Sequence, residues 1–346
     1  MVNSNNIKTC LIVAPSWVGD MVMAQSLFKI LIAQNPELKI DVLAPAWCSA
    51  LTDYMPEVNR LIEAPFAHGA LNFGRRWQLA KGLKGQYDVA YVLPNSLKSA
   101  LVPWLAKIPR RIGFLGEQRY GLLNQRHLLN KQKLPLMVQR FVALAKEVGA
   151  EPAAKADIPA PHLRVDRHKI EQTLQQYELT LSDASRVLVL CPGAEFGAAK
   201  QWPEEHYAAV ARFYIDAGWQ VWLFGSEKDF STCAAINKLS HQKCHNLAGK
   251  TSLSDAIALL AAADLVVSND SGLMHVAAAL QKPLVAIYGS TDPSFTPPLN
   301  HNARIERLGL DCSPCFKRDC PLGHLDCLKK LPPRQILAAA ETLLGV

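Results

Sequence analysis

The sequence has no apolar run of the roughly 18 to 20 residues that a helix needs to cross a bilayer. Such a run is absent even though 49% of its 346 residues are hydrophobic. Residues 1–6 (MVNSNN) also lack the charged and apolar regions of a signal peptide. We therefore expect a globular protein of the cytoplasm, long enough for two domains of ordinary size.

Two nucleotide-binding fingerprints are also missing. No G-x-G-x-x-G follows an expected strand, which argues against a dinucleotide redox cofactor, and no G-x-x-x-x-G-K-[ST] marks a P-loop. No pair of carboxylates has obvious metal-ligand spacing at the polar corner described below. We therefore expect no metal cofactor in catalysis, so that a lysine and a helix N-terminus would have to stabilise a departing diphosphate.

Acidic residues are scarce between positions 98 and 131, where Glu117 stands against seven basic residues. These are Lys98, Lys107, Arg110, Arg111, Arg119, Arg126 and Lys131. Such a stretch suits an anionic membrane surface or a phosphorylated substrate, and its alternative is a solvated basic face. No nucleic-acid-binding motif accompanies the charge, so we expect no nucleic-acid partner.

Short apolar segments alternate with helical ones along the whole chain, which indicates parallel sheets covered on both faces. The expected strands span 7–14, 39–43, 89–93, 187–190, 220–224, 265–268 and 284–288. A segment rich in Ala and Pro at 149–162 reads as a linker. We predict an α/β protein with two Rossmann-like domains, 1–160 and 161–346, that face a central cleft. For a final helix at 333–344, the N-terminal domain is one packing partner that we consider.

The segment 266–279 (VVSNDSGLMHVAAA) reads as a strand, a polar corner and a helix. Asp270, Ser271 and Gly272 crowd at the corner, and His275 follows one turn into the helix. Free backbone N–H groups and the positive end of the helix dipole make such a corner suitable for the diphosphate of a nucleotide-linked donor. The alternative is an ordinary helix cap formed by Asp270 or Ser271.

Other loops of the second half add parts for the same ligand. Gly193 and Gly197 allow close backbone approach, Lys200 supplies a positive charge, and Glu227 follows a strand where a carboxylate could accept ribose hydroxyls. Because all follow expected strands, they should meet at the carboxyl end of one sheet. The alternatives are a solvated loop lysine at Lys200 and a helix-start acid at Glu227.

In the first half, Asp20 lies where the first expected strand gives way to a helix. A carboxylate at this position is either a cap stabilised by the helix dipole or a general base that faces the ligand.

Nine cysteines fall into two sets. Five are scattered and are expected to act as small buried apolar groups: Cys10, Cys48, Cys191, Cys233 and Cys244. The other four, Cys312, Cys315, Cys320 and Cys327, have enough thiols in 16 residues for a structural zinc or similar site, with His324 nearby. Free or redox-formed thiols are the alternative.

Four segments together resemble the lipopolysaccharide heptosyltransferase II group of glycosyltransferase family 9. They are 15–21 (PSWVGDM), 192–203 (PGAEFGAAKQWP), 269–275 (NDSGLMH) and 295–299 (FTPPL). The resemblance covers nearly the whole chain. It implies the two-domain GT-B fold and transfer of L-glycero-D-manno-heptose from ADP-heptose to the first heptose of the lipid A–Kdo inner core, with inversion and without a required metal.

The resemblance also implies roles for individual residues. Asp20 would be the general base, Lys200 would hold the diphosphate and Glu227 the ribose. The donor heptose and phosphates would be held by Gly193, Asp270, Ser271, Gly272 and His275. The N-terminal half would bind the heptosyl-Kdo-lipid A acceptor through Ser16, Lys98, Arg110, Arg111 and Arg119, and would lie peripherally on the anionic inner membrane.

Other functions remain open at this point. A heptosyltransferase I, another sugar-nucleotide-dependent GT-B transferase or an epimerase would share the architecture, although the missing dinucleotide fingerprint weighs against the epimerase. A nucleotide-binding peripheral membrane module without catalysis is the alternative outside enzymes, and it would have no use for a base at Asp20.

Overall fold

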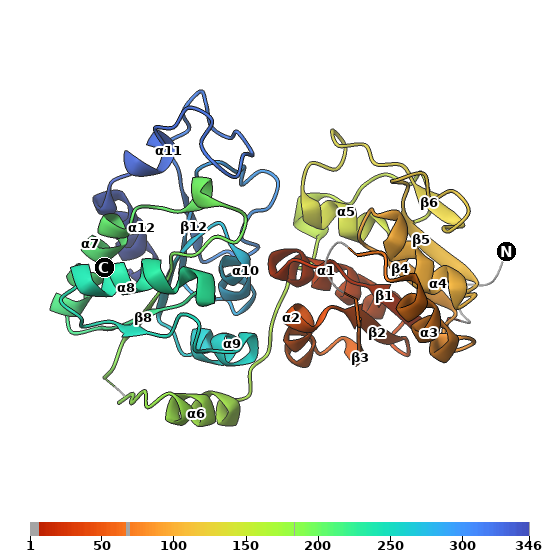
Figure 1. The fold of residues 1–346 in the computed structure, drawn as a ribbon, viewed down its shortest axis with the longest axis horizontal. Coiled ribbons are helices and arrows are strands. Elements are labelled where there is room, and N and C mark those ends of the chain that lie inside the picture. The colour runs from red at the N-terminus through yellow and green to blue at the C-terminus, as the bar shows by residue number, and fades with distance from the viewer. Residues whose placement is uncertain (1–6, 67–69, 183, 346) are drawn as a thin grey trace. The chain divides into compact units, whose positions relative to one another are not determined.

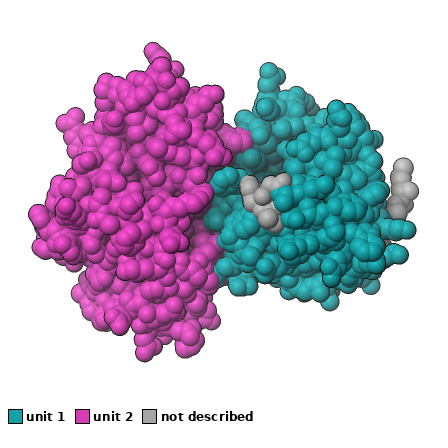
Figure 2. Space-filling view, viewed as in Figure 1, with its two compact units in different colours: residues 1–161 teal, residues 162–346 magenta. Residues whose placement is uncertain are grey.

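A computed structural model describes residues 7–66, 70–182 and 184–345. The chain divides into two compact units, residues 1–161 and 162–346, which are coloured separately in Figure 2. The linker composition predicts the division at residue 160, and the structure places it one residue later. No helix in the described residues is both long and apolar enough to cross a membrane.

The first unit is built on a parallel six-stranded sheet with the order β3-β2-β1-β4-β5-β6 (Figure 1). The strands are β1 (Thr9–Val13), β2 (Lys39–Ala44), β3 (Val58–Glu63), β4 (Val89–Val92), β5 (Arg110–Phe114) and β6 (Gln125–His127). The central strands are apolar and buried, as expected for strands covered on both faces.

Helices pack on both faces of this first sheet. The helix α1 (Val18–Gln34) packs with α5 (Met137–Ala143), while α3 (Phe73–Leu83) packs with α4 (Leu101–Leu105). Short helices complete the unit: α2 (Ala46–Ser49) and the 3₁₀ helices η2 (Ala50–Tyr54), η3 (Leu97–Ala100) and η4 (Lys155–Asp157).

The second unit repeats the plan with the order β12-β11-β10-β7-β8-β9. Its strands are β7 (Val187–Cys191), β8 (Gln220–Leu223), β9 (His245–Asn246), β10 (Leu265–Asn269), β11 (Leu284–Ile287) and β12 (Ala303–Glu306). Its helices are α6 (Arg167–Gln176), α7 (Glu204–Asp216), α8 (Phe230–Leu239), α9 (Leu253–Ala261), α10 (Gly272–Ala279), α11 (Asp326–Lys329) and α12 (Pro333–Leu344), with 3₁₀ helices η5 (Ala198–Lys200) and η6 (Glu227–Asp229).

Alternate residues of the second sheet point into one core. Leu188 and Leu190 of β7 lie in the same cluster as buried side chains of α7, α8 and α12, which is the period of two expected of strands. The final helix α12 packs on β11, β12 and α7. Ile336 and Ala340 of this helix complete the core of its own unit, and its packing against the N-terminal domain stays a prediction.

Both sheets have the strand order of a dinucleotide-fold sheet, in which two halves wind outward from a central pair of strands. In the first unit this central pair is β1 and β4, and in the second it is β7 and β10. Ligands of open α/β sheets bind at the carboxyl ends of this pair, so we expect ligands at the loops 14–20 and 93–96, and at the loops 192–200 and 270–272.

Candidate active site

A buried ion pair lies at the carboxyl ends of the central strands of the second unit. Lys200 Nζ is 2.6 Å from Asp270 Oδ2, and the two side chains are 14% and 4% exposed. Lys200 also donates to the backbone oxygen of Asp270 at 3.3 Å, and Thr291 Oγ1 donates to Asp270 Oδ2 at 2.5 Å. Two residues predicted separately for donor binding are therefore one unit, in which the carboxylate fixes the position of the ammonium group.

Asn269, the last residue of β10, anchors the loop that carries Lys200. Its side-chain nitrogen donates to the Pro192 carbonyl at 2.5 Å. Its side-chain oxygen accepts from Trp202 N at 3.2 Å and from the Tyr207 hydroxyl at 3.0 Å. Because Asn269 is fully buried, these bonds are expensive to break, and they hold the loops after β7 and β10 together.

The helix α10 begins directly at this corner. Ser271 is its N-cap residue, and among the described residues its side chain makes no capping hydrogen bond. Ser271 Oγ lies 3.3 Å from Ser268 Oγ. The first N–H groups of α10, which include that of Gly272, are thus a site for an anion beside Lys200.

His275 is 5% exposed in the first turn of α10. Burial lowers its pKa from 6.5 to about 4, the Asp270 carboxylate opposes this change, and the Lys200 ammonium adds to it. The imidazole is therefore neutral at pH 7, and it brings no positive charge to a diphosphate.

The loop at Gly193 packs tightly against the loop that carries Glu227. A Cβ atom at Gly193 would lie 2.5 Å from the Asp229 carboxylate, so a larger residue there would displace the Asp229 side chain. That carboxylate accepts from Ser226 N at 2.8 Å and from Ser226 Oγ at 2.7 Å. Glu227 itself is exposed at the start of η6, where its carboxylate can reach a ligand.

Asp20 lies in the first turn of α1, directly after β1. Its side chain is partly exposed, and the helix dipole stabilises its carboxylate form. Two tryptophans lie in the loops beside it: Trp17, the N-cap residue, and Trp47, whose indole N–H donates to the Ser16 carbonyl at 2.8 Å. Both are nearly half exposed, so flat apolar surface is available next to the carboxylate.

Arg119, predicted to bind the acceptor, is only 1% exposed. Its guanidinium donates to the carbonyls of Phe114 and Pro94, each at 2.7 Å, and to the Ser96 carbonyl and Ser99 Oγ, each at 3.0 Å. Burial lowers its pKa to about 10, and Glu117 opposes this. Its role is therefore structural, because its donors already join the loop after β4 to the end of β5.

The other basic residues of this stretch differ in their availability. Arg111 donates to the carbonyls of Leu122 at 2.7 Å and Ile108 at 2.6 Å, so it too holds backbone. Arg110 is partly exposed in β5 with one long bond of 3.4 Å to Gln125. Lys98 is partly exposed in η3, so these last two stay as predicted acceptor contacts.

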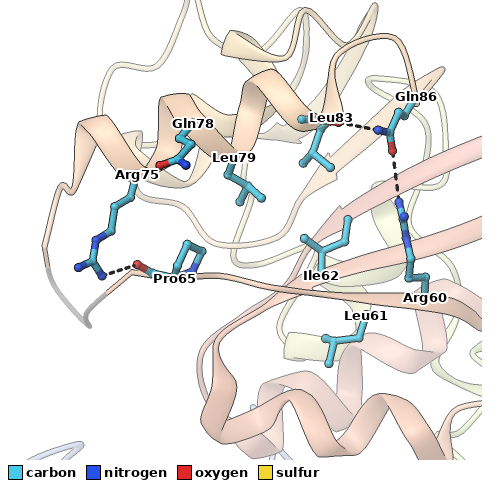
Figure 3. Close-up of a pocket in the computed structure, with 10 residues that line it drawn as sticks. Arg60, Leu61, Ile62, Pro65, Arg75, Gln78, Leu79, Leu83 and Gln86 are labelled. Carbon is cyan, nitrogen blue, oxygen red and sulfur yellow. Dashed lines mark hydrogen bonds between the residues drawn. The ribbon is translucent and has the colours of Figure 1, made fainter.

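A cavity of about 700 Å³ lies in the first unit, and none of these residues lines it. Figure 3 shows its position between β3 and α3, with Leu79, Leu83 and Ile62 lining it and Arg60 and Arg75 at its rim. Arg60 is engaged by Asp41 at 2.9 Å. This groove at the outer strand of the first sheet holds no residue that the sequence predicted for the site.

Sequence reasoning missed three residues of these loops. Thr291 holds the Asp270 carboxylate and Asn269 anchors the Lys200 loop, while Trp47 flanks the Asp20 turn. Their position in the sequence could have indicated them, because each lies at or just beyond the carboxyl end of a strand.

Comparisons with known proteins identify the family. The model of glycosyltransferase family 9 (heptosyltransferase) matches residues 76–326. The chain is 48% identical over 342 residues to lipopolysaccharide heptosyltransferase 2 of Salmonella typhimurium, covering 97% of this chain and 98% of that one. It is 49% identical over 306 residues to lipooligosaccharide heptosyltransferase 2 of Haemophilus influenzae, covering 86% and 88%.

A solved structure gives the same result. The ADP-heptose lipopolysaccharide heptosyltransferase II of Escherichia coli superimposes with a TM-score of 0.87 at 44% identity, over 97% of this chain and 98% of that one. The two-sheet fold is thus that of the GT-B heptosyltransferases, as the resemblance implied. The chain belongs to glycosyltransferase family 9, the heptosyltransferases, and is a glycosyltransferase.

Proposed function

We propose that this enzyme transfers heptose from ADP-heptose to the first heptose of the lipopolysaccharide inner core. The observation that carries the proposal is the division of polar groups between the two units. A carboxylate, Asp20, lies at the central strands of the first, while a buried cation and a helix N-terminus lie at those of the second. The first suits a base and the second suits a diphosphate.

In the proposed reaction, the acceptor hydroxyl attacks the anomeric carbon of the donor, and the bond from that carbon to the ADP oxygen breaks. Asp20 takes the hydroxyl proton as the new glycosidic bond forms, and ADP leaves with the electron pair of the broken bond. One displacement inverts the configuration at the anomeric carbon.

The leaving diphosphate is stabilised by Lys200 and by the N–H groups at the start of α10. Asp270 acts as a positioning residue, since its carboxylate is held by Lys200 and Thr291 rather than directed at a phosphate. His275 is neutral and fills the buried side of the site. Gly193 lets the backbone approach the ligand, and Glu227 binds the ribose. No metal ion takes part in this step.

The acceptor is bound by the first unit. Trp17 and Trp47 offer apolar faces for a sugar ring beside Asp20, while Lys98 and Arg110, which are both partly exposed, contact acceptor phosphates. We place the enzyme on the cytoplasmic side of the inner membrane, held peripherally by basic residues of the 98–131 stretch that remain exposed.

The test is ADP release from ADP-heptose in the presence of EDTA, with lipid A–Kdo acceptors that carry either no heptose or one heptose. We expect turnover only with the one-heptose acceptor. Turnover only with the acceptor that lacks heptose would assign the enzyme to the first transfer instead. Tight ADP binding with no turnover on either acceptor would contradict the proposed transfer and favour a nucleotide-binding module.

A further inference from the structure

Four cysteines of the second unit line one small cavity. Cys312, Cys315, Cys320 and Cys327 surround a space of about 20 Å³, together with His324 and Ser290. That volume holds about one water-sized sphere. None of the four forms a disulfide, and each is partly exposed, whereas the five cysteines elsewhere are buried.

The backbone around Cys320 is arranged for a thiolate. The backbone amides of Leu322, Gly323, His324 and Leu325 all donate hydrogen bonds toward its sulfur. A turn whose N–H groups point at one sulfur is how proteins hold thiolate ligands of a metal, because those hydrogen bonds offset the negative charge.

Ser290 provides a second, independent observation. Ser290 is 1% exposed and lines the same cavity, and its hydroxyl has no hydrogen-bond partner among the described residues. A buried hydroxyl without a partner is costly. A thiolate held next to it by a metal would accept its proton in a hydrogen bond.

We propose that Cys312, Cys315, Cys320 and Cys327 bind a single metal ion of the zinc class in a tetrahedral tetrathiolate site. Four sulfurs with no oxygen ligand select zinc or a single iron over magnesium or calcium. Across residues 7–66, 70–182 and 184–345 no three ligating side chains already stand in a metal-binding arrangement. The sulfurs must therefore turn inward when the ion binds.

The metal site supports the donor loops of the proposed function. In the cysteine segment, the Arg318 carbonyl accepts a hydrogen bond at 2.9 Å from Ala199 N, next to Lys200. The guanidinium of Arg318 lies 5.6 Å from the Phe196 ring. Phe316 N donates to the Ser290 carbonyl at 2.7 Å, one residue before Thr291. The ion thus fixes both loops that position the Lys200–Asp270 pair.

The experiment measures metal content by elemental analysis in the full-length enzyme purified under reducing conditions. We expect about one zinc or iron per chain in the unmodified enzyme. We expect Cys320→Ser to lose it and the matched control Cys244→Ser, whose thiol is buried elsewhere, to keep it. If Cys320→Ser does not fold, titration of the unmodified enzyme with a mercurial reagent should release the metal into a chelating dye as the four thiols react.

Several results would overturn the site: zinc-supplemented enzyme that retains no metal, disulfides among the four cysteines in the reduced preparation, or two or more irons per chain. A second measurement tests the link to the donor loops. Removing the metal should weaken ADP binding by about tenfold, and unchanged ADP affinity would refute that link. Neither readout requires turnover, so failure of the metal site is distinguishable from failure of the proposed reaction.

Discussion

The two units have the same strand order, yet each uses its buried cation differently. In the first unit, Arg119 donates only to neutral carbonyl, hydroxyl and amide oxygens and so fixes the loop after β4. In the second, Lys200 is paired with the carboxylate of Asp270. A cation bound to neutral groups has a structural role, whereas one held beside a helix N-terminus can share its charge with an anionic ligand.

The largest effect that would sharpen this comparison comes from Asp20. Asp20→Asn keeps the size of the side chain and removes its ability to accept a proton, so turnover should fall about a thousandfold. ADP affinity should not change, because the proposed ADP site lies in the second unit. Assays of ADP release and calorimetry with ADP check both statements. The control is Asp53→Asn, an exposed residue of η2 in the same unit, and near-full turnover by Asp20→Asn would remove Asp20 from the mechanism.

Breaking the ion pair of the second unit should have the next largest effect. Lys200→Met leaves the Asp270 carboxylate buried without its cation, which should lower the free energy of unfolding by about 3 to 4 kcal/mol and weaken ADP binding. Urea denaturation and ADP calorimetry measure the two effects. The matched control is Lys228→Met, because Lys228 pairs with Glu195 at 75% and 53% exposure, so solvent screens the pair and its loss should change stability little. Equal effects of the two variants would mean that burial is not what distinguishes the pairs.

Arg119 provides the corresponding test in the first unit. Arg119→Met leaves several backbone carbonyls without donors, so the free energy of unfolding should fall by about 3 kcal/mol. Urea denaturation compares it with Arg126→Met, which removes an exposed arginine of β6 and should change stability by about 0.5 kcal/mol or less. If Arg119→Met unfolds like the unmodified enzyme and only the KM for the acceptor rises, Arg119 binds the acceptor after all.

The smallest expected effect is a pH dependence confined to the second unit. The pKa of His275 is about 4 in the folded protein against 6.5 ordinarily, so the folded state binds fewer protons than the unfolded state between these values. Stability from this residue is complete above pH 6.5 and is lost as the pH falls, by about 2 kcal/mol at pH 5.

Unfolding measured from pH 7 to pH 5 checks this dependence. His275→Gln should flatten the decline, while His241→Gln, at an exposed position, should leave it intact. An unaltered slope in His275→Gln would show that other groups carry the pH dependence.

Strongly apolar elements could be predicted from the sequence, because their burial shows in composition alone. The central strands and α12 lie within two residues of their expected bounds. The outer strands β3, β6, β9 and β12 were not predicted, because charged and polar residues at sheet edges resemble loops. For the same reason Arg110 and Arg111 were read as part of a basic surface stretch although they begin β5.

The sequence could predict at which end of the sheet the candidate site residues lie, but not which side chains contact one another. Each donor residue follows a strand, which places it at the correct end of the sheet. Whether Lys200 meets Asp270, or Arg119 meets carbonyls instead of a ligand, depends on side-chain directions that sequence spacing does not encode. His275 illustrates the limit, because its neutral state results from burial that only the folded chain provides.

The unequal burial of the donor loops has a consequence for how this enzyme could evolve. The loops proposed to bind the diphosphate are tied into the core through Asn269, whereas Glu227 lies exposed on η6. Substitutions near Glu227 therefore carry little stability cost. New nucleotide preferences could arise in that loop by single steps, while the handling of the diphosphate would stay fixed.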